Sequence, residues 1–82
     1  MELQVTSTFE KAFRKYNILT KQHIDLAIRL LEVDAYVGKP LRGNLVGKWS
    51  IRSGGYRVIY TLNEVEKIVI LYDTMHRKKV YK

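Results

Sequence analysis

The chain has 82 residues and a mass of 9.7 kDa, enough for one small domain over residues 1–82 and too little for two. Hydrophobic residues make up 46% of it, so a packed core is expected and intrinsic disorder is not. The absence of cysteine excludes disulfides, thiolate zinc sites and a thiol nucleophile. Without a signal peptide or an apolar run of roughly 20 residues, a soluble, cytoplasmic protein is expected.

Positive charge is concentrated in the second half of the chain. Fifteen basic and eight acidic residues give a formal charge of +7. Residues 42–82 carry nine basic and three acidic side chains, whereas residues 1–41 carry six and five. This asymmetry is typical of proteins that bind a polyanion such as nucleic acid, although an ordinary solvated surface is the alternative.

The first elements are a short strand and a helix. Alternating apolar and β-branched residues predict a strand around Leu3–Val5. Ser7 and Glu10 then have the spacing of a helix-capping box. The apolar residues after them repeat at i, i+3, i+4 and i+7, as one face of a helix does, until Asn17 interrupts the pattern.

A second helix is expected from Thr20, as its N-cap, to about Tyr36. Leu19 and Ile24 have the spacing of a hydrophobic staple, and an apolar stripe continues from Ile24. Gly38-Lys39-Pro40 ends the helical region, because glycine favours a left-handed cap and proline cannot continue a helix. The short break between the two helices implies an antiparallel helical hairpin.

The second half changes to the two-residue period of β-strands. Strands are expected over Leu45–Arg52, Tyr56–Leu62 and Val65–Tyr72, separated by turns at Ser53-Gly54-Gly55 and Asn63-Glu64. Residues 74–82 form a short basic tail. In the first of these strands, alternation predicts that the side chains of Leu45, Trp49 and Ile51 face the core.

The expected fold is α+β. An antiparallel helical hairpin packs on a mostly antiparallel four-stranded sheet, which includes the N-terminal strand. Trp49 is interpreted as a core residue, since it alternates with the cations. The other face of the sheet is left polar and open, and it carries Lys48, Ser50, Arg52 and Arg57.

The residue inventory argues against most catalytic sets. The two histidines, His23 and His76, have no metal-binding spacing, and no glycine-rich phosphate loop precedes a helix. Lys48 and Arg57 instead have the parity to share one sheet face, and cations placed there could stabilise a phosphodiester attacked by its own 2′-hydroxyl. The alternative is that these are solvated surface charges.

Three sequence blocks resemble those of a known family. They are Leu41-Arg42-Gly43-Asn44-Leu45, Trp49-Ser50-Ile51-Arg52-Ser53-Gly54-Gly55-Tyr56-Arg57-Val58-Ile59-Tyr60 and His76-Arg77-Lys78-Lys79-Val80-Tyr81. In this order they resemble the RelE/ParE superfamily of toxins from type II toxin–antitoxin systems, and most closely its RelE branch. The resemblance spans nearly the whole chain.

The resemblance implies a RelE-like, microbial-ribonuclease-like fold and a function. Members of the RelE branch are mRNA interferases, endoribonucleases that cleave mRNA in the ribosomal A site without a metal or cofactor and so inhibit translation. The implied partners are the 70S-type ribosome with its mRNA and a RelB-like antitoxin, whose complex with the toxin is expected to bind operator DNA.

The same resemblance assigns Lys48, Arg57 and Arg77 to the scissile phosphate and Tyr81 to the 2′-hydroxyl. An unperturbed tyrosine is only about one part in a thousand ionised at pH 7, so we expect Tyr81 to position the nucleophile. Ser50 stands where the family pattern has a second lysine, which removes one cation. Further candidates for catalysis or RNA binding are Arg42, Ser50, Arg52, His76 and Lys78.

Two other functions fit the same scaffold. The first is a ParE-like inhibitor of DNA gyrase without nuclease activity, and the second is a non-catalytic RNA-binding module. The combination of Lys48, Arg57, Arg77 and Tyr81 favours the nuclease, because the gyrase branch does not require it.

Overall fold

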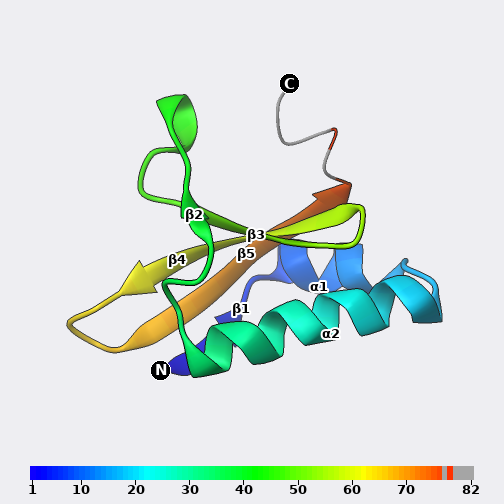
Figure 1. Cartoon of the computed structure of the whole chain (residues 1–82), viewed down its shortest axis with the longest axis horizontal. Coiled ribbons are helices and arrows are strands. Elements are labelled where there is room, and N and C mark those ends of the chain that lie inside the picture. Colours follow the sequence, from blue (N-terminus) through cyan, green and yellow to red (C-terminus); the bar gives the residue numbers. More distant parts are fainter. Residues whose placement is uncertain (77, 79–82) are drawn as a thin grey trace.

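The computed structural model describes residues 1–76 and 78, which form two helices on one side of a five-stranded sheet (Figure 1). The elements in chain order are β1 (Glu2–Val5), α1 (Ser7–Arg14), α2 (Ile18–Val33), β2 (Lys39–Pro40), the 3₁₀ turn η1 (Gly43–Leu45), β3 (Trp49–Ser53), β4 (Tyr56–Asn63) and β5 (Ile68–His76).

The strand order across the sheet is β1-β5-β4-β3-β2. The pairs from β5 to β2 are antiparallel, and β1 lies parallel to β5 at the other edge. The α+β class and the mostly antiparallel sheet are therefore confirmed. The sheet has a fifth strand beyond the four expected, because Lys39 and Pro40 pair with Ser50 and Trp49. Proline is tolerated there because β2 is an edge strand.

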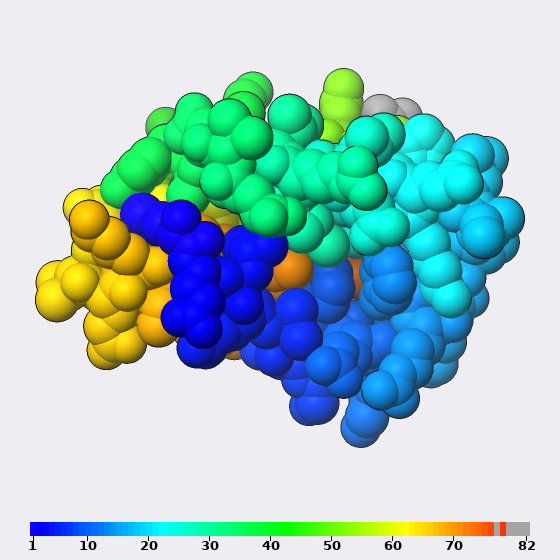
Figure 2. Space-filling model, turned by 90° about the horizontal axis from the view of Figure 1, so that it is seen from below, coloured from blue at the N-terminus to red at the C-terminus, as the bar shows by residue number. Residues whose placement is uncertain are grey.

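Both helices cover the same face of the sheet. Figure 2 shows that face, with α1 and α2 side by side and β1 next to them. The stripe predicted on the second helix is buried there, since Ile24, Ala27 and Leu31 are at most 1% exposed. Trp49 packs against the same core, as expected, and its ring meets Tyr36 edge-on at 5.8 Å. No helix in the described part of the chain is long and apolar enough to cross a membrane.

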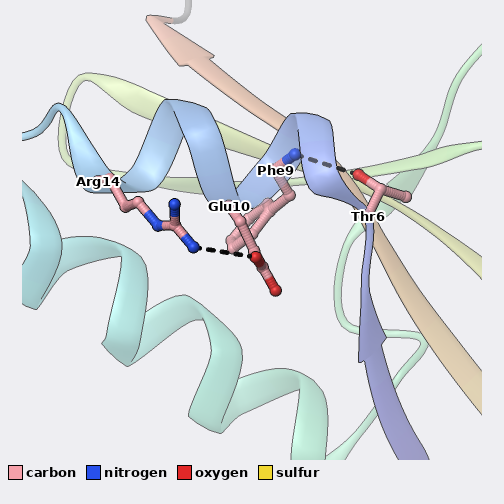
Figure 3. A network of polar contacts seen from close by, with 4 residues as sticks. All are labelled: Thr6, Phe9, Glu10 and Arg14. Carbon is pink, nitrogen blue, oxygen red and sulfur yellow. Dashed lines mark hydrogen bonds and ion pairs between the residues drawn. The ribbon is translucent and has the colours of Figure 1, made fainter.

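The first helix begins one residue away from its predicted cap. Thr6, not Ser7, is the N-cap, and its Oγ1 accepts a hydrogen bond of 3.1 Å from the backbone N–H of Phe9 (Figure 3). The same hydroxyl donates to the carbonyl oxygen of Tyr72 on β5, at 2.6 Å. Glu10 pairs with Arg14 at 3.4 Å (Figure 3). The hydrogen bond to Tyr72 explains the choice of cap, because it ties the Thr6 hydroxyl to β5 as well as to the helix.

The second helix begins earlier and ends earlier than expected. Asn17 is its N-cap, and Asn17 Oδ1 accepts from the backbone N–H of Thr20 at 2.8 Å. Thr20 is therefore inside the helix, and the staple predicted between Leu19 and Ile24 is wrong, because Leu19 is 61% exposed. The helix ends at Val33 rather than near Tyr36.

Two strand boundaries also differ. The strand expected from Leu45 begins only at Trp49, because residues 43–45 form η1 and Gly47 adopts a φ of +91° that breaks the extended chain. The last strand runs over Ile68–His76 instead of Val65–Tyr72. Asn63 Oδ1 accepts from the N–H of Glu66, which holds Val65 in an exposed turn.

A buried tyrosine fixes the segment that leads from α2 into β2. The Tyr60 hydroxyl donates to the carbonyl of Ala35 at 3.0 Å and accepts from the N–H of Gly38 at 3.1 Å. Gly38 has no room for a side chain, since a Cβ would lie 2.6 Å from the carbonyl oxygen of Ser50. This close approach brings β2 against β3, where Lys39 pairs with Ser50.

Candidate nucleic-acid interface

The polar face predicted from strand alternation exists in the described sheet. Arg52 pairs directly with Arg57, and Ser50 pairs with Ile59 in the same β3–β4 ladder. Directly paired residues share a face and successive residues alternate. Ser50, Arg52 and Arg57 therefore lie on the face away from the helices, while Ile51 and Val58 face the core.

Arg57 is held in place by Ser50. Nη1 of the half-buried Arg57 donates to Ser50 Oγ at 3.3 Å, and Ser50 is only 3% exposed. This contact restricts the orientation of the guanidinium, a group whose planar geometry matches phosphate oxygens. The serine that replaces an expected lysine thus contributes an acceptor instead of a charge.

Lys48 lies just before β3, two residues from Ser50 and with the same parity. Its carbonyl oxygen accepts from the N–H of Leu41 at 2.8 Å. Its Nζ lies 4.7 Å from the ring centroid of Tyr72, within the range of a cation–π contact. The sequence does not identify Tyr72 as part of this face, because its pattern predicts Tyr72 only as the last residue of a strand; the side chain is 40% exposed.

A pocket of about 350 Å³ opens where β2 and η1 meet the polar face. Three of its lining residues are cations, and the rest supply an apolar wall and one hydroxyl. The lining residues are Lys39, Pro40, Leu41, Arg42, Leu45, Ser50 and Arg57. Arg42, Ser50 and Arg57 were candidates from sequence, whereas the other four were not. Lys39 could be identified as a site residue only from its pairing with Ser50 on the neighbouring strand β3.

His76 lies on the other side of the sheet. It pairs with Tyr56, and the two rings meet edge-on with centroids 5.4 Å apart. Tyr56 packs against the core beneath the helices, whereas the neighbouring pair, Arg57 and Met75, has the opposite parity. The structure therefore does not bring the His76 side chain together with Arg57.

The remaining candidates divide into two groups. Arg52 and Lys78 are exposed, Arg52 on the polar face but outside the pocket lining, and Lys78 next to His76, whose Nδ1 accepts from the Lys78 N–H at 3.3 Å. Arg77 and Tyr81 lie outside the described residues, so their assignments stay predictions.

The tyrosines with shifted acidities are not on the polar face. Burial is the main cause that raises the pKa of Tyr16 and of Tyr60 above the ordinary value of 10.0. Both rings pack against the core, so they are structural. Among residues 1–76 and 78, no three histidine or carboxylate side chains are grouped as a metal site would need.

Comparisons of the sequence with known proteins identify related toxins. A family model described as the ParE toxin of type II toxin–antitoxin systems matches residues 3–81. Toxin RelG of Mycobacterium tuberculosis is 39% identical over 46 residues, which span 56% of this chain and about half, 53%, of RelG.

Solved structures of toxins share the fold. The toxin–antitoxin complex RelBE2 of Mycobacterium tuberculosis contains a chain with a TM-score of 0.82 and 28% identity, covering 93% of this chain and 96% of that one. The isolated Escherichia coli RelE toxin gives 0.78 and 20%, covering 98% and 89%, and shows likeness of fold alone. With a family match over nearly its whole length, the chain belongs to the ParE toxin family of type II toxin–antitoxin systems and has a RelE-like fold.

Proposed function

We propose that this protein is a toxin that cleaves mRNA in the ribosomal A site by metal-independent attack of a 2′-hydroxyl, and so inhibits translation. The observation that carries the proposal is the Arg57 guanidinium, which donates to Ser50 and lines a cationic pocket on the sheet face away from the helices. Membership of the toxin family supports it.

The chemistry needs positive charge more than it needs a metal. The 2′-oxygen forms a bond to phosphorus while the bond from phosphorus to the 5′-oxygen breaks, which yields a 2′,3′-cyclic phosphate and a 5′-hydroxyl. The 2′-hydroxyl loses its proton and the leaving oxygen gains one. Extra negative charge develops on the nonbridging oxygens, where preorganised donors stabilise it. Arg57 has this role in our proposal, with Lys48 and Arg77 as further cations and Tyr81 orienting the 2′-hydroxyl.

The proposed partners follow from the same relatives. RelBE2 is a complex of toxin with antitoxin, as is the Escherichia coli RelBE complex. We expect a RelB-like antitoxin for this chain as well, with an acidic segment that covers the basic face and excludes RNA. Binding of operator DNA by that complex is a further expectation, and the ribosome with its mRNA is the expected substrate assembly.

Replacing Arg57 by alanine tests the nuclease directly. We expect cleavage of a translated message, followed by primer extension, to fall about 10²–10³-fold, because a donor to the developing charge is lost. Arg14→Ala is the matched control, since Arg14 is exposed on α1, on the opposite layer. Far-UV circular dichroism should be unchanged in both variants. Equal cleavage by the wild type and Arg57→Ala would contradict the proposal.

A second function has its own support, since the matching family model is described by the name ParE. A ParE-like inhibitor would block supercoiling by purified DNA gyrase and leave translated mRNA intact. A non-catalytic RNA-binding module would bind RNA with a strong salt dependence and do neither. The supercoiling assay and primer extension on the same protein preparation separate the three functions.

A further inference from the structure

The pocket beside Arg57 has two chemically different sides. Lys39 and Arg42 are exposed cations at its rim. The apolar wall consists of Pro40, Leu41 and Leu45. No carboxylate is among the described residues that line it, so no negative charge of the lining would repel a bound anion. Neither Lys39 nor the apolar wall has a role in the proposed cleavage step.

Hydrogen bonds close the loop that forms this pocket. The N–H of Leu41 donates to the carbonyl of Lys48 at 2.8 Å, and the N–H of Lys48 donates to that of Leu45 at 3.1 Å. Gly43 and Gly47 supply the positive φ values, +70° and +91°, that the tight path needs. Leu45 is half-buried in the pocket lining while the adjacent Val46 is 75% exposed. The pocket is therefore formed before any ligand binds.

We infer that this pocket binds one nucleotide of single-stranded RNA, adjacent to the scissile phosphate. Lys39 and Arg42 contact the backbone phosphate, and the base lies against Pro40, Leu41 and Leu45. The pocket has a volume of about 350 Å³, at the small end of the ~300–1,000 Å³ of ligand sites, which suits one nucleotide. The inference rests on the proposed function, since it deepens how the same face recognises RNA.

The composition of the wall also predicts how the base is recognised. Recognition of RNA bases uses hydrogen bonds to base edges and stacking on aromatic rings or on Arg guanidinium planes. The described lining residues include no aromatic ring, and their only neutral hydroxyl, that of Ser50, is nearly fully buried. The three cations of the lining, Lys39, Arg42 and Arg57, are assigned to phosphates in this proposal. The pocket should therefore require a base but not distinguish one base from another.

Removing the base and removing the wall should have coupled effects. The probe is a five-nucleotide single-stranded RNA with one 2′-deoxy residue at the position that reacts, so that it binds without being cleaved. An abasic residue is moved along it, and affinity is measured by titration calorimetry. At one position the abasic residue should weaken binding about 5–10-fold, the size expected for burying part of an apolar surface. With Leu45→Ser that difference should disappear, whereas with Val46→Ser it should remain.

A second variant tests the phosphate contact without disturbing packing. Lys39→Gln should reduce the slope of log affinity against log salt by about 0.7, the value for one phosphate contact to a single strand. Lys11→Gln is the control, because Lys11 is exposed on α1 in the other layer and should leave the slope unchanged. The wild-type affinity should vary less than about 3-fold when the base at the sensitive position is exchanged, a difference smaller than one good hydrogen bond provides.

The outcomes separate this inference from the function on which it rests. If the wild type cleaves translated mRNA but no abasic position is coupled to Leu45→Ser, or if no binding is detected at millimolar RNA, the pocket is not a nucleotide site. A strong preference for one base at that position would overturn the recognition mode. If the coupling is present but translated mRNA stays intact, the nuclease proposal fails and the RNA site stands.

Discussion

Ser50 illustrates how one residue can change its role within a shared scaffold. It stands where the family pattern has a lysine, yet it is nearly fully buried and accepts a hydrogen bond from Arg57. A neutral acceptor in this position orients the guanidinium instead of adding a second charge. In the proposed nuclease Ser50 is therefore a positioning residue for Arg57, and Lys48 is correspondingly positioned by the ring of Tyr72.

Replacing Ser50 by alanine should reduce cleavage by about 3–10-fold, the equivalent of one neutral hydrogen bond, because Arg57 then loses an acceptor that fixes its direction. Single-turnover primer extension measures the loss. The free energy of unfolding should change little, since alanine fits the buried space. Ser53→Ala, at the end of the same strand, is the control and should cleave normally. Unchanged cleavage by Ser50→Ala would show that Arg57 does not need this contact.

At the scale of elements, the start of α1 shows how a helix boundary depends on its surroundings. The sequence offers adjacent hydroxyls at Thr6 and Ser7, and the spacing to Glu10 favours the second. The structure uses Thr6, because its hydroxyl caps the helix and also donates to the carbonyl of Tyr72 on β5. One side chain therefore joins the end of β1, the start of α1 and the middle of the sheet.

We expect Thr6→Ala to lower the free energy of unfolding by about 1–2 kcal/mol, the range for loss of a helix N-cap. Ser7→Ala, as the matched control at the neighbouring hydroxyl, should change it by less than about 0.5 kcal/mol, as surface substitutions usually do. Urea denaturation followed by circular dichroism measures both, and Thr6→Ser should restore most of the loss. A larger effect at Ser7 than at Thr6 would contradict the observed cap.

At the scale of the whole molecule, Tyr60 connects the core to the segment that builds the pocket. Burial raises its pKa above the ordinary value of 10.0, although the hydrogen bond from the backbone of Gly38 partly opposes the shift. The folded state therefore keeps the phenol protonated at pH values where the unfolded chain has begun to ionise. The stabilisation that results is complete below about pH 10 and is lost as pH rises through the higher pKa of the folded state.

Tyr60→Phe should make this pH dependence shallower. At pH 7 the variant should be less stable by about 1–3 kcal/mol, since the N–H of Gly38 and the carbonyl of Ala35 lose their partner. Above pH 10 its free energy of unfolding should fall less steeply than that of the wild type. Some slope should remain, because burial shifts the pKa of Tyr16 in the same direction. Urea denaturation from pH 7 to 11 tests this, and identical slopes would exclude a role for Tyr60.

Those features that depend on local periodicity could be predicted from the sequence. The helical repeat identified Ile24, Ala27 and Leu31 as core residues, and all three are buried. Strand alternation placed Arg57 on the polar face, where the β3–β4 register confirms it. These predictions succeed because a helix turn and a strand pleat fix which side chains share a face, whatever the rest of the chain does.

Only the tertiary structure decided which segments meet. The parallel pairing of β1 with β5 and the addition of β2 beside β3 join residues far apart in sequence, and no local pattern encodes such pairs. The pocket exists because Lys39 pairs with Ser50 in that last ladder. His76 lies on the opposite face because the β4–β5 register pairs it with Tyr56, which packs against the core. Side-chain periodicity determines faces, but the free energy of packing between distant segments determines which faces form a site.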